Sequence, residues 1–158
     1  MRLKDKVAII TGAANGLGFE ASRIFAQEGA KVAMVDYDAK TGEERAAQLK
    51  EEGGDVAFFQ VNVADRDSVD AMVEEVVKRY SKIDILINNA GITRDGMLTK
   101  LSVENFQAVI NVNLTGVFHC TQAVVPHMIA QGKGKIISTS SVSGVYGNVG
   151  QKNYVAKK

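Results

Sequence analysis

Five short stretches of the chain are apolar at almost every position and do not alternate with polar residues. This pattern is typical of strands buried on both faces of a parallel sheet. The stretches are rich in valine and isoleucine, which favour strands. The five predicted strands are KVAII (6–10), KVAMV (31–35), DVAFFQV (55–61), DILIN (84–88) and KIIST (135–139).

Between these stretches, apolar residues recur every three or four positions, which indicates helices. The predicted helices cover 18–28, 40–52, 68–80 and 103–130, and the last range is long enough for two helices. Pro126 is expected to end or bend the helix that contains it. Strands that alternate with helices form right-handed βαβ units, so the sequence predicts an α/β fold with a Rossmann-like, doubly wound parallel sheet.

Composition narrows the class of protein. Apolar residues make up 46% and charged residues 23% of the chain, as in globular domains, and no linker or repeat interrupts the pattern, which predicts one domain over 1–158. The net charge of +1 favours neither nucleic acid nor an anionic membrane. No apolar run approaches the roughly 20 residues of a spanning helix. The only cysteine, Cys120, cannot form an internal disulfide, which indicates a reducing compartment such as the cytoplasm.

Residue types that bind metals gather in one predicted helix. His119, Cys120 and His127 lie there, but no carboxylate or second thiol completes a recognisable metal spacing. A structural role is therefore favoured for these residues, and no metal site is predicted.

The loop after the first predicted strand is rich in glycine. The segment TGAANGLG carries Gly12, Gly16 and Gly18 in a G-x-x-x-G-x-G spacing, in place of the more common G-x-G-x-x-G fingerprint. Glycine permits positive φ and the close approach of a pyrophosphate, and the following helix offers free N–H groups at its positive end. A tight turn without a ligand would have the same glycines, so the loop alone leaves both interpretations open.

An acidic residue at the end of the second predicted strand favours a dinucleotide site. Asp36 follows the loop by about twenty residues, where a carboxylate accepts hydrogen bonds from the adenosine ribose and repels a 2′-phosphate. No Arg or Lys in 13–15 would neutralise that phosphate. Asp36 therefore predicts NAD as the preferred cofactor, with NADP as the alternative, although a solvated turn carboxylate would look the same in the sequence.

Several motifs in this order resemble those of the short-chain dehydrogenase/reductase family, and the resemblance extends over the entire chain. TGAANGLG is similar to the family's T-G-x-x-x-G-x-G, and NNAG (88–91) to its strand-four motif. Within the family, GITRDGMLTKLSVENFQAVINVNLTGVF and GNVGQKNY are most similar to bacterial 3-oxoacyl-[acyl-carrier-protein] reductases and to acetoacetyl-CoA reductases.

The resemblance implies an NAD(P)-dependent oxidoreductase that transfers a hydride between nicotinamide and a ketone or secondary alcohol. The implied substrate is a 3-oxoacyl thioester of acyl carrier protein or CoA, as in fatty acid biosynthesis. The implied assembly is a homo-oligomer. Partners of nucleic acid or membrane are not expected, on the grounds of charge and apolar run length given above.

The resemblance also implies a catalytic tetrad of Asn113, Ser141, Tyr154 and Lys158. Tyr154 would donate the proton, and Lys158, one helical turn later, would favour the phenolate, because a free phenol has a pKa of about 10. Ser141 would orient the substrate oxygen, and Asn113 would hold a water on a proton path. Neighbouring hydroxyls offer the same chemistry, and only the spacing to Tyr154 selects Ser141.

The cofactor-binding residues implied by the resemblance come from four loops. They are Gly12, Asn15, Gly16, Leu17, Gly18, Asp36, Asn62, Val63, Asn89, Ala90 and Gly91. Asn62 stands where family members usually have aspartate, which is expected to weaken an adenine contact.

The family fold has seven strands, and this chain resembles its first five, in the order 3-2-1-4-5. We therefore expect the chain to be a dinucleotide-binding domain truncated at its C-terminal end. KIIST would then be an open sheet edge, which is prone to pairing. An alternative function is an inactive dinucleotide-binding fragment that associates with itself through this edge.

Overall fold

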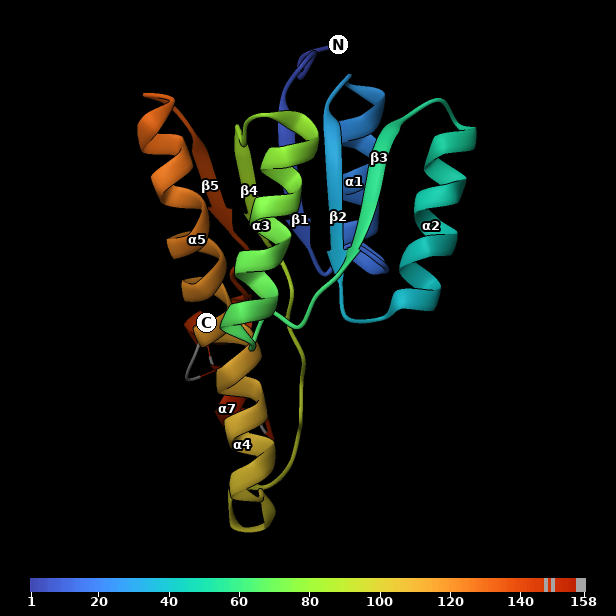
Figure 1. Ribbon diagram of the computed structural model, residues 1–158. Helices are drawn as coiled ribbons and strands as arrows, with labels where there is room; N and C mark the ends of the chain where they lie inside the picture. The colour runs from blue at the N-terminus through green and yellow to red at the C-terminus, as the bar shows by residue number, and fades with distance from the viewer. Residues whose placement is uncertain (147, 149, 156–158) are drawn as a thin grey trace.

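A five-stranded parallel sheet forms the centre of the computed structural model, in the order β3-β2-β1-β4-β5 (Figure 1). The structure describes residues 1–146, 148 and 150–155. The strands are β1 (Val7–Thr11), β2 (Lys31–Asp36), β3 (Asp55–Gln60), β4 (Ile85–Asn88) and β5 (Lys135–Ser138). The predicted fold class and strand order are confirmed, and every strand begins and ends within one residue of its predicted range.

The order of the strands reverses beside β1, which pairs with β2 on one side and with β4 on the other. In this arrangement Ile9 is the partner of both Ala33 and Leu86. The loops that leave the carboxyl ends of β1 and β4 run to opposite faces of the sheet. Such a reversal leaves a crevice at the carboxyl edge, where open α/β sheets bind their ligands.

Helices cover both faces of the sheet (Figure 1). The helices α1 (Gly16–Gln27) and α2 (Ala39–Glu51) lie on one face, and α3 (Arg66–Tyr80) and α5 (Gly116–Ala130) on the other. Alternate strand residues enter two separate cores, so Val7 and Ile9 pack with α3 and α5 whereas Ala8 and Ile10 pack with α1 and α2. Burial on both faces explains the continuous apolar runs of β1, β2 and β4, whereas the edge strand β3 is buried only at Val56 and Ala57.

The strand β5 departs from this pattern. All four of its residues are exposed, and the isoleucines Ile136 and Ile137 are 40% and 51% exposed. On one side β5 pairs with β4, and no strand of the described part of the chain pairs with its other side. The prediction that KIIST is buried on both faces is therefore wrong, whereas the expectation of an open edge holds for the described residues.

One continuous helical run extends over Val103–Ala130. It joins α4 (Val103–Ile110), a π-helical turn η2 (Asn111–Thr115) and α5. Pro126 lies within α5, and the helix continues to Ala130, so the proline does not end it.

By length and composition, the run over Val103–Ala130 could cross a membrane, which corrects the statement that no run approaches that length. Core helices of globular proteins pass the same test. One side of α5 packs on the sheet and α3 through residues such as Val124 and Met128. The lack of a membrane partner stays a prediction.

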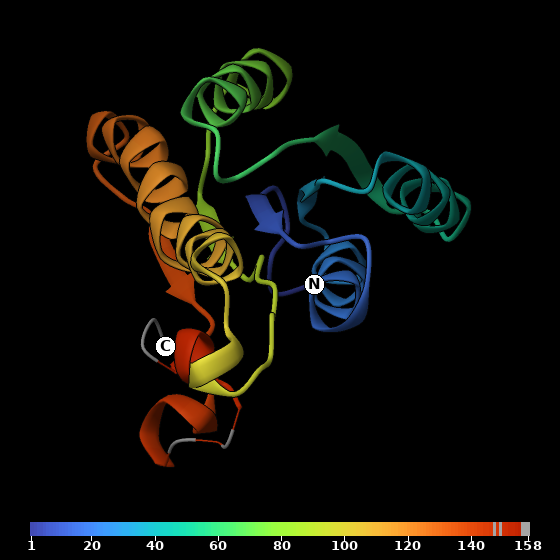
Figure 2. The same cartoon turned by 90° about the horizontal axis from the view of Figure 1, so that it is seen from below.

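Short segments complete the described chain near the carboxyl edge. The turns η1 (Leu98–Lys100), α6 (Val142–Tyr146) and α7 (Lys152–Val155) lie in this region. Figure 2 shows the C-terminal turns beside the segment that follows β4. Two hydrogen bonds join these parts: the Gly96 N–H donates to the Gly150 carbonyl at 2.7 Å, and Gln151 Nε2 donates to Asp95 Oδ2 at 3.1 Å. The turn before α7 is thereby held against the loop between β4 and α4.

Candidate functional site

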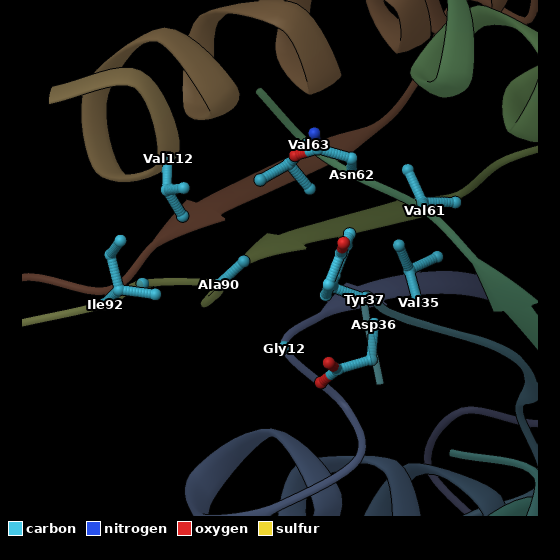
Figure 3. Close-up of a pocket in the computed structure, with 11 residues that line it drawn as sticks. Gly12, Val35, Asp36, Tyr37, Val61, Asn62, Val63, Ala90, Ile92 and Val112 are labelled. Carbon is cyan, nitrogen blue, oxygen red and sulfur yellow. The ribbon is translucent and has the colours of Figure 1, made fainter. Parts of the chain in front are cut away.

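A cavity of about 340 Å³ opens at the carboxyl edge of the sheet (Figure 3). Its lining residues are Gly12, Val35, Asp36, Tyr37, Val61, Asn62, Val63, Ala90, Gly91, Ile92 and Val112. Figure 3 shows Asp36 on the side of Gly12, with Val63 and Val112 on the opposite side. The cavity therefore lies between the loops that follow β1, β2, β3 and β4, at the reversal of strand order.

Six of the eleven predicted cofactor residues line this cavity. They are Gly12, Asp36, Asn62, Val63, Ala90 and Gly91. The other five, Asn15, Gly16, Leu17, Gly18 and Asn89, lie outside its lining. Gly16 and Leu17 instead line a shallow depression between α1 and α2, and the Leu17 side chain is 76% exposed.

The glycine loop requires its glycines for two different reasons. Gly12 has a φ of +67°, and a Cβ there would lie 2.9 Å from the Ala90 Cα. At Gly18, a Cβ would collide with the carbonyl oxygen of Gly12 and lie 2.7 Å from Asn89 Nδ2. A side chain at either position would push the loop away from the end of β4, so the bare backbone of this loop is part of the fold.

Asp36, at the end of β2, uses both carboxylate oxygens within the protein. Oδ2 accepts a hydrogen bond from the Ala14 N–H at 3.0 Å, and Oδ1 accepts one from the Asp38 N–H at 3.1 Å. Asp38 in turn caps α2: its carboxylate accepts from the side-chain hydroxyl and backbone N–H of Thr41, and these bonds lower the pKa of Asp38 below its usual range. Asp36 thus joins the loop after β1 to the loop after β2.

Asn89 acts as a clamp between β1 and β4. Its Nδ2 donates to the Thr11 and Gly12 carbonyl oxygens at 3.1 and 3.3 Å. The Thr11 hydroxyl oxygen accepts the N–H groups of Asn89 and Ala90, both at 3.0 Å. Asn89 therefore holds the glycine loop from behind, outside the cavity lining. Thr11 was missed in the sequence because its role depends on a partner 78 residues away.

Asn62 makes the local contact that an aspartate would make at the same place. Its Oδ1 accepts a hydrogen bond from the Ala64 N–H at 3.1 Å, and its own N–H donates to Ser68 Oγ at 3.2 Å. The next residue, Val63, has its carbonyl oxygen 3.1 Å from His119 Nδ1. Both predicted residues after β3 are thus fixed by short polar contacts at the cavity wall.

Five lining residues were not predicted from the sequence: Val35, Tyr37, Val61, Ile92 and Val112. The first three lie at the carboxyl ends of β2 and β3, and this position alone could have identified them. Tyr37 is 72% exposed at the cavity. Ile92 and Val112 come from the loop after β4 and from the π-helical turn, whose approach to the cavity only the structure reveals.

Asn113 is buried in the π-helical turn and contacts the cavity wall from behind. Its Oδ1 accepts from the Ile92 N–H and its Nδ2 donates to the Ile92 carbonyl oxygen, both at 2.8 Å. The side chain pairs with this backbone much as a neighbouring strand would. Asn113 thereby fixes the loop after β4, which includes the lining residues Gly91 and Ile92.

The other predicted catalytic residues follow β5. Ser141 directly precedes α6, and its Oγ accepts from the Ser143 N–H at 3.2 Å. Tyr154 lies in α7, half-buried, and α7 packs against α4 and α6. Lys158 lies outside the described residues. Ser141 and Tyr154 therefore stand on elements near the helix that carries Asn113, in the region shown in Figure 2.

The candidate metal-binding residues His119, Cys120 and His127 do not form a metal site with other described residues. Burial raises the pKa of the Cys120 thiol to about 12, so the thiol stays protonated at neutral pH. Within 1–146, 148 and 150–155, no group of three or more His, Cys, Asp or Glu side chains could hold a metal ion. The absence of a metal cofactor stays a prediction for the chain as a whole.

Comparison with known proteins identifies the family to which the chain belongs. A family model described as short chain dehydrogenase matches residues 6–158. The chain belongs to the short-chain dehydrogenase family. Membership of this family implies a nicotinamide dinucleotide, NAD or NADP, as cofactor.

This short-chain dehydrogenase is similar to several 3-oxoacyl-[acyl-carrier-protein] reductases. It is 49% identical over 158 residues to that of Thermotoga maritima, which covers all of this chain and 64% of the relative. Identity is 43% over 157 residues with the Synechocystis sp. protein, covering 99% and 64%, and 44% over 154 residues with the Staphylococcus aureus Mu50 protein, covering 97% and 63%. The chain thus spans less than two thirds of the length of these curated relatives.

Proposed function

We propose that this short-chain dehydrogenase is an NAD(P)-dependent oxidoreductase of ketones and secondary alcohols, with 3-oxoacyl thioesters as its substrates. The observation that carries the proposal is the cavity at the reversal of strand order, which combines the bare backbone of Gly12 with the carboxylate of Asp36. The names of the relatives support a thioester substrate, carried by acyl carrier protein or by CoA.

The residues present fit a dinucleotide. The glycine loop and the first N–H groups of α1 would hold the pyrophosphate. Apolar side chains of Val35, Val61 and Val63 would pack on the adenine, and Asp36 would accept hydrogen bonds from the adenosine ribose. We propose a preference for NAD, because a carboxylate repels a 2′-phosphate. The bound dinucleotide would supply the hydride chemistry, while residues of the chain orient the substrate and move the proton.

The proton would move through residues that follow β5. Tyr154 would donate it to the substrate oxygen, and the Lys158 ammonium would stabilise the phenolate left behind. The Ser141 hydroxyl would donate a hydrogen bond to the same substrate oxygen. Asn113 would hold a water that connects Lys158 to solvent. Its contacts with Ile92 support a fixed position for this side chain.

A spectrophotometric assay tests the proposal. Oxidation of NADH and of NADPH is followed at 340 nm with acetoacetyl-CoA as substrate, beside a titration of each cofactor followed by fluorescence. Turnover with NADH faster than with NADPH is expected, and Tyr154→Phe should reduce the rate by about 100-fold or more while cofactor binding is kept. Cofactor binding without turnover over a range of 3-oxoacyl thioesters would refute the oxidoreductase for this chain.

Assembly and location belong to the same proposal. The helical run over Val103–Ala130 exposes large apolar side chains at Val103, Phe106, Leu114, Phe118 and Ile129. Exposed apolar surface on this scale favours association, which supports a homo-oligomer. The single buried cysteine and the relatives' names are compatible with a cytoplasmic protein.

A second candidate function is dinucleotide binding without catalysis, with self-association through the edge of β5. The exposure of Ile136 and Ile137 on this edge favours it, because unpaired apolar edge strands recruit other strands. Sedimentation velocity of Ile137→Lys beside the unchanged chain separates the two functions. An oligomer that persists in Ile137→Lys and turns over substrate would exclude this candidate.

A further inference from the structure

The carboxylate of Asp36 does more than face the place of a ribose. Its Oδ2 accepts the Ala14 N–H at 3.0 Å, and Ala14 is in the middle of the glycine loop. The Ala14 residue is fully buried, and the Asp36 carboxylate is the acceptor that satisfies its N–H in the folded chain. Loss of the acceptor would leave a buried N–H group without a partner, which proteins avoid.

The neighbouring N–H of the loop provides a contrast. The Ala13 N–H donates to the Val35 carbonyl oxygen at 3.1 Å, which is a contact with the backbone of β2. Thus one anchor of the glycine loop is independent of side chains, and the next depends on Asp36. These two bonds tie Ala13 and Ala14 to the end of β2, while Asn89 holds the loop at the Gly12 carbonyl oxygen.

We propose that Asp36 is a positioning residue for the glycine loop, in addition to its candidate contact with the ribose. The proposal rests on the proposed dinucleotide site. A carboxylate has about four acceptor positions, and the Ala14 and Asp38 N–H groups use two of them. The remaining positions are open to ribose hydroxyls, so both tasks can be performed at once.

Because of this double role, replacement of Asp36 is expected to change the affinity for both dinucleotides as well as the preference between them. A small residue would remove the repulsion of a 2′-phosphate, and it would also release the loop that binds the pyrophosphate. Asp36→Ala is therefore expected to weaken NAD and NADP together, beyond any change in the preference between them. Asp36→Asn removes the same charge, and its single amide oxygen can still accept the Ala14 N–H, while both variants lose the bond to the Asp38 N–H.

The test uses a ligand that Asp36 cannot contact through the ribose. ADP and 2′,3′-dideoxy-ADP are titrated by calorimetry into the unchanged chain, Asp36→Asn and Asp36→Ala. Because the two variants have the same charge, their difference isolates the loop contact. We expect 2′,3′-dideoxy-ADP to bind Asp36→Ala about fivefold more weakly than Asp36→Asn, the size of one ordinary hydrogen bond. Equal affinities of the two variants for 2′,3′-dideoxy-ADP would overturn the proposal.

Amide hydrogen exchange provides a second readout that needs no ligand. The Ala14 N–H should exchange at least about fivefold faster in Asp36→Ala than in Asp36→Asn, while the Ala13 N–H stays slow in both. Equal Ala14 rates would contradict the proposal even if the chain bound no nucleotide, and failure of the unchanged chain to bind ADP or NAD would instead count against the proposed function. If Asp36→Ala does not fold, Asp36→Ser, whose hydroxyl is one bond shorter than the carboxylate, takes its place.

Discussion

The neighbouring strands β4 and β5 have similar sequences, ILIN and KIIS, but opposite surroundings. All four residues of β4 are buried, and all four of β5 are exposed. Leu86 and Ile136 are direct partners in the ladder, with exposed fractions of 0% and 40%. Both segments form strands because their sequences are apolar. Whether a strand is buried depends on the elements that pack beside it, so the well-buried part of the sheet ends at β4.

The division matters for the proposed chemistry. The cavity is lined entirely by residues up to Val112, most of them at the carboxyl ends of β1 to β4. Ser141 and Tyr154 follow β5, on short turns with fewer packed neighbours. We therefore expect nucleotide binding to depend on the firmly packed part, and proton transfer to depend on the less supported part.

The largest expected effect contrasts the two ladder partners. Leu86→Ala should lower the free energy of unfolding by about 4 kcal/mol, because it leaves a cavity in the core between the sheet and α3 and α5. Ile136→Ala removes a side chain of similar size that is already 40% exposed, so the expected loss is about 1 kcal/mol. Urea denaturation measures both. Similar losses for the two variants would show that β5 is as firmly packed as β4.

The next effect concerns the glycine loop. Gly18→Ala should destabilise the chain by about 3 kcal/mol and abolish nucleotide binding, because the new Cβ would collide with the Gly12 carbonyl oxygen. Gly16→Ala is the matched control. A Cβ there meets nothing within 4 Å, and its φ of +54° predicts a loss of only about 1 kcal/mol. Thermal unfolding with and without NAD checks both, and equal losses would argue against the close packing of this loop.

A buried carboxylate at the opposite edge of the sheet gives a pH-dependent prediction. Burial alone raises the pKa of Asp84, but the Val7 N–H and the ammonium groups of Lys82 and Lys6 outweigh it and lower the pKa below the usual 3.8. The Val7 N–H donates to Asp84 Oδ2 at 2.9 Å. Asp84→Asn should therefore cost about 2 kcal/mol at pH 7.

The sign of the pH effect follows from the lowered pKa. The stabilisation by Asp84 is complete above the unfolded-state pKa of 3.8 and is lost as the pH falls through the lower folded-state value. The difference in stability between the unchanged chain and Asp84→Asn should thus shrink below about pH 4. Denaturation at a series of pH values measures it, and a difference that grows on acidification would have the wrong sign.

The smallest expected effect lies at the start of α4. The Ser102 side chain accepts from the Asn105 N–H at 3.2 Å as the N-cap, so Ser102→Ala should destabilise α4 locally by about 1 kcal/mol. Asp65→Ala removes the N-cap of α3 and serves as the control. If α4 opens by itself, Ser102→Ala should speed hydrogen exchange in α4 without lowering global stability, whereas Asp65→Ala lowers global stability. A full global loss from Ser102→Ala would instead place α4 within the firmly packed part.

Much of the fold could be predicted from the sequence because local patterns encode it. The apolar runs gave all five strands, and their alternation with helices gave the parallel sheet. The glycine spacing and Asp36 led to the carboxyl edge, where six predicted residues line the cavity. The exposure of β5 could not be predicted in this way, because the residues of a strand do not show which other elements pack against it.

Two details of the site could not be predicted because they depend on contacts between residues far apart in the sequence. Asn89 was expected beside a cofactor, but its amide reaches behind the loop to the carbonyl oxygens of Thr11 and Gly12. Asp36 was interpreted by its charge alone, and its bond to Ala14 was not foreseen. The length of the helical run over Val103–Ala130 was missed because scattered polar residues interrupt the apolar pattern in the sequence, whereas the helix itself is continuous.

The direction in which the Asn113 side chain points depends on the number of residues in the π-helical turn that contains it. Such a turn contains one residue more than an α-helical turn, and each residue rotates a helix by about 100°. Deletion of a single residue within Asn111–Thr115 would leave every side chain of α5 in register with the sheet. It would also turn α4 away from the loop that Asn113 holds through Ile92. The contact between Asn113 and Ile92 therefore depends on the length of the helix around it as well as on the asparagine itself.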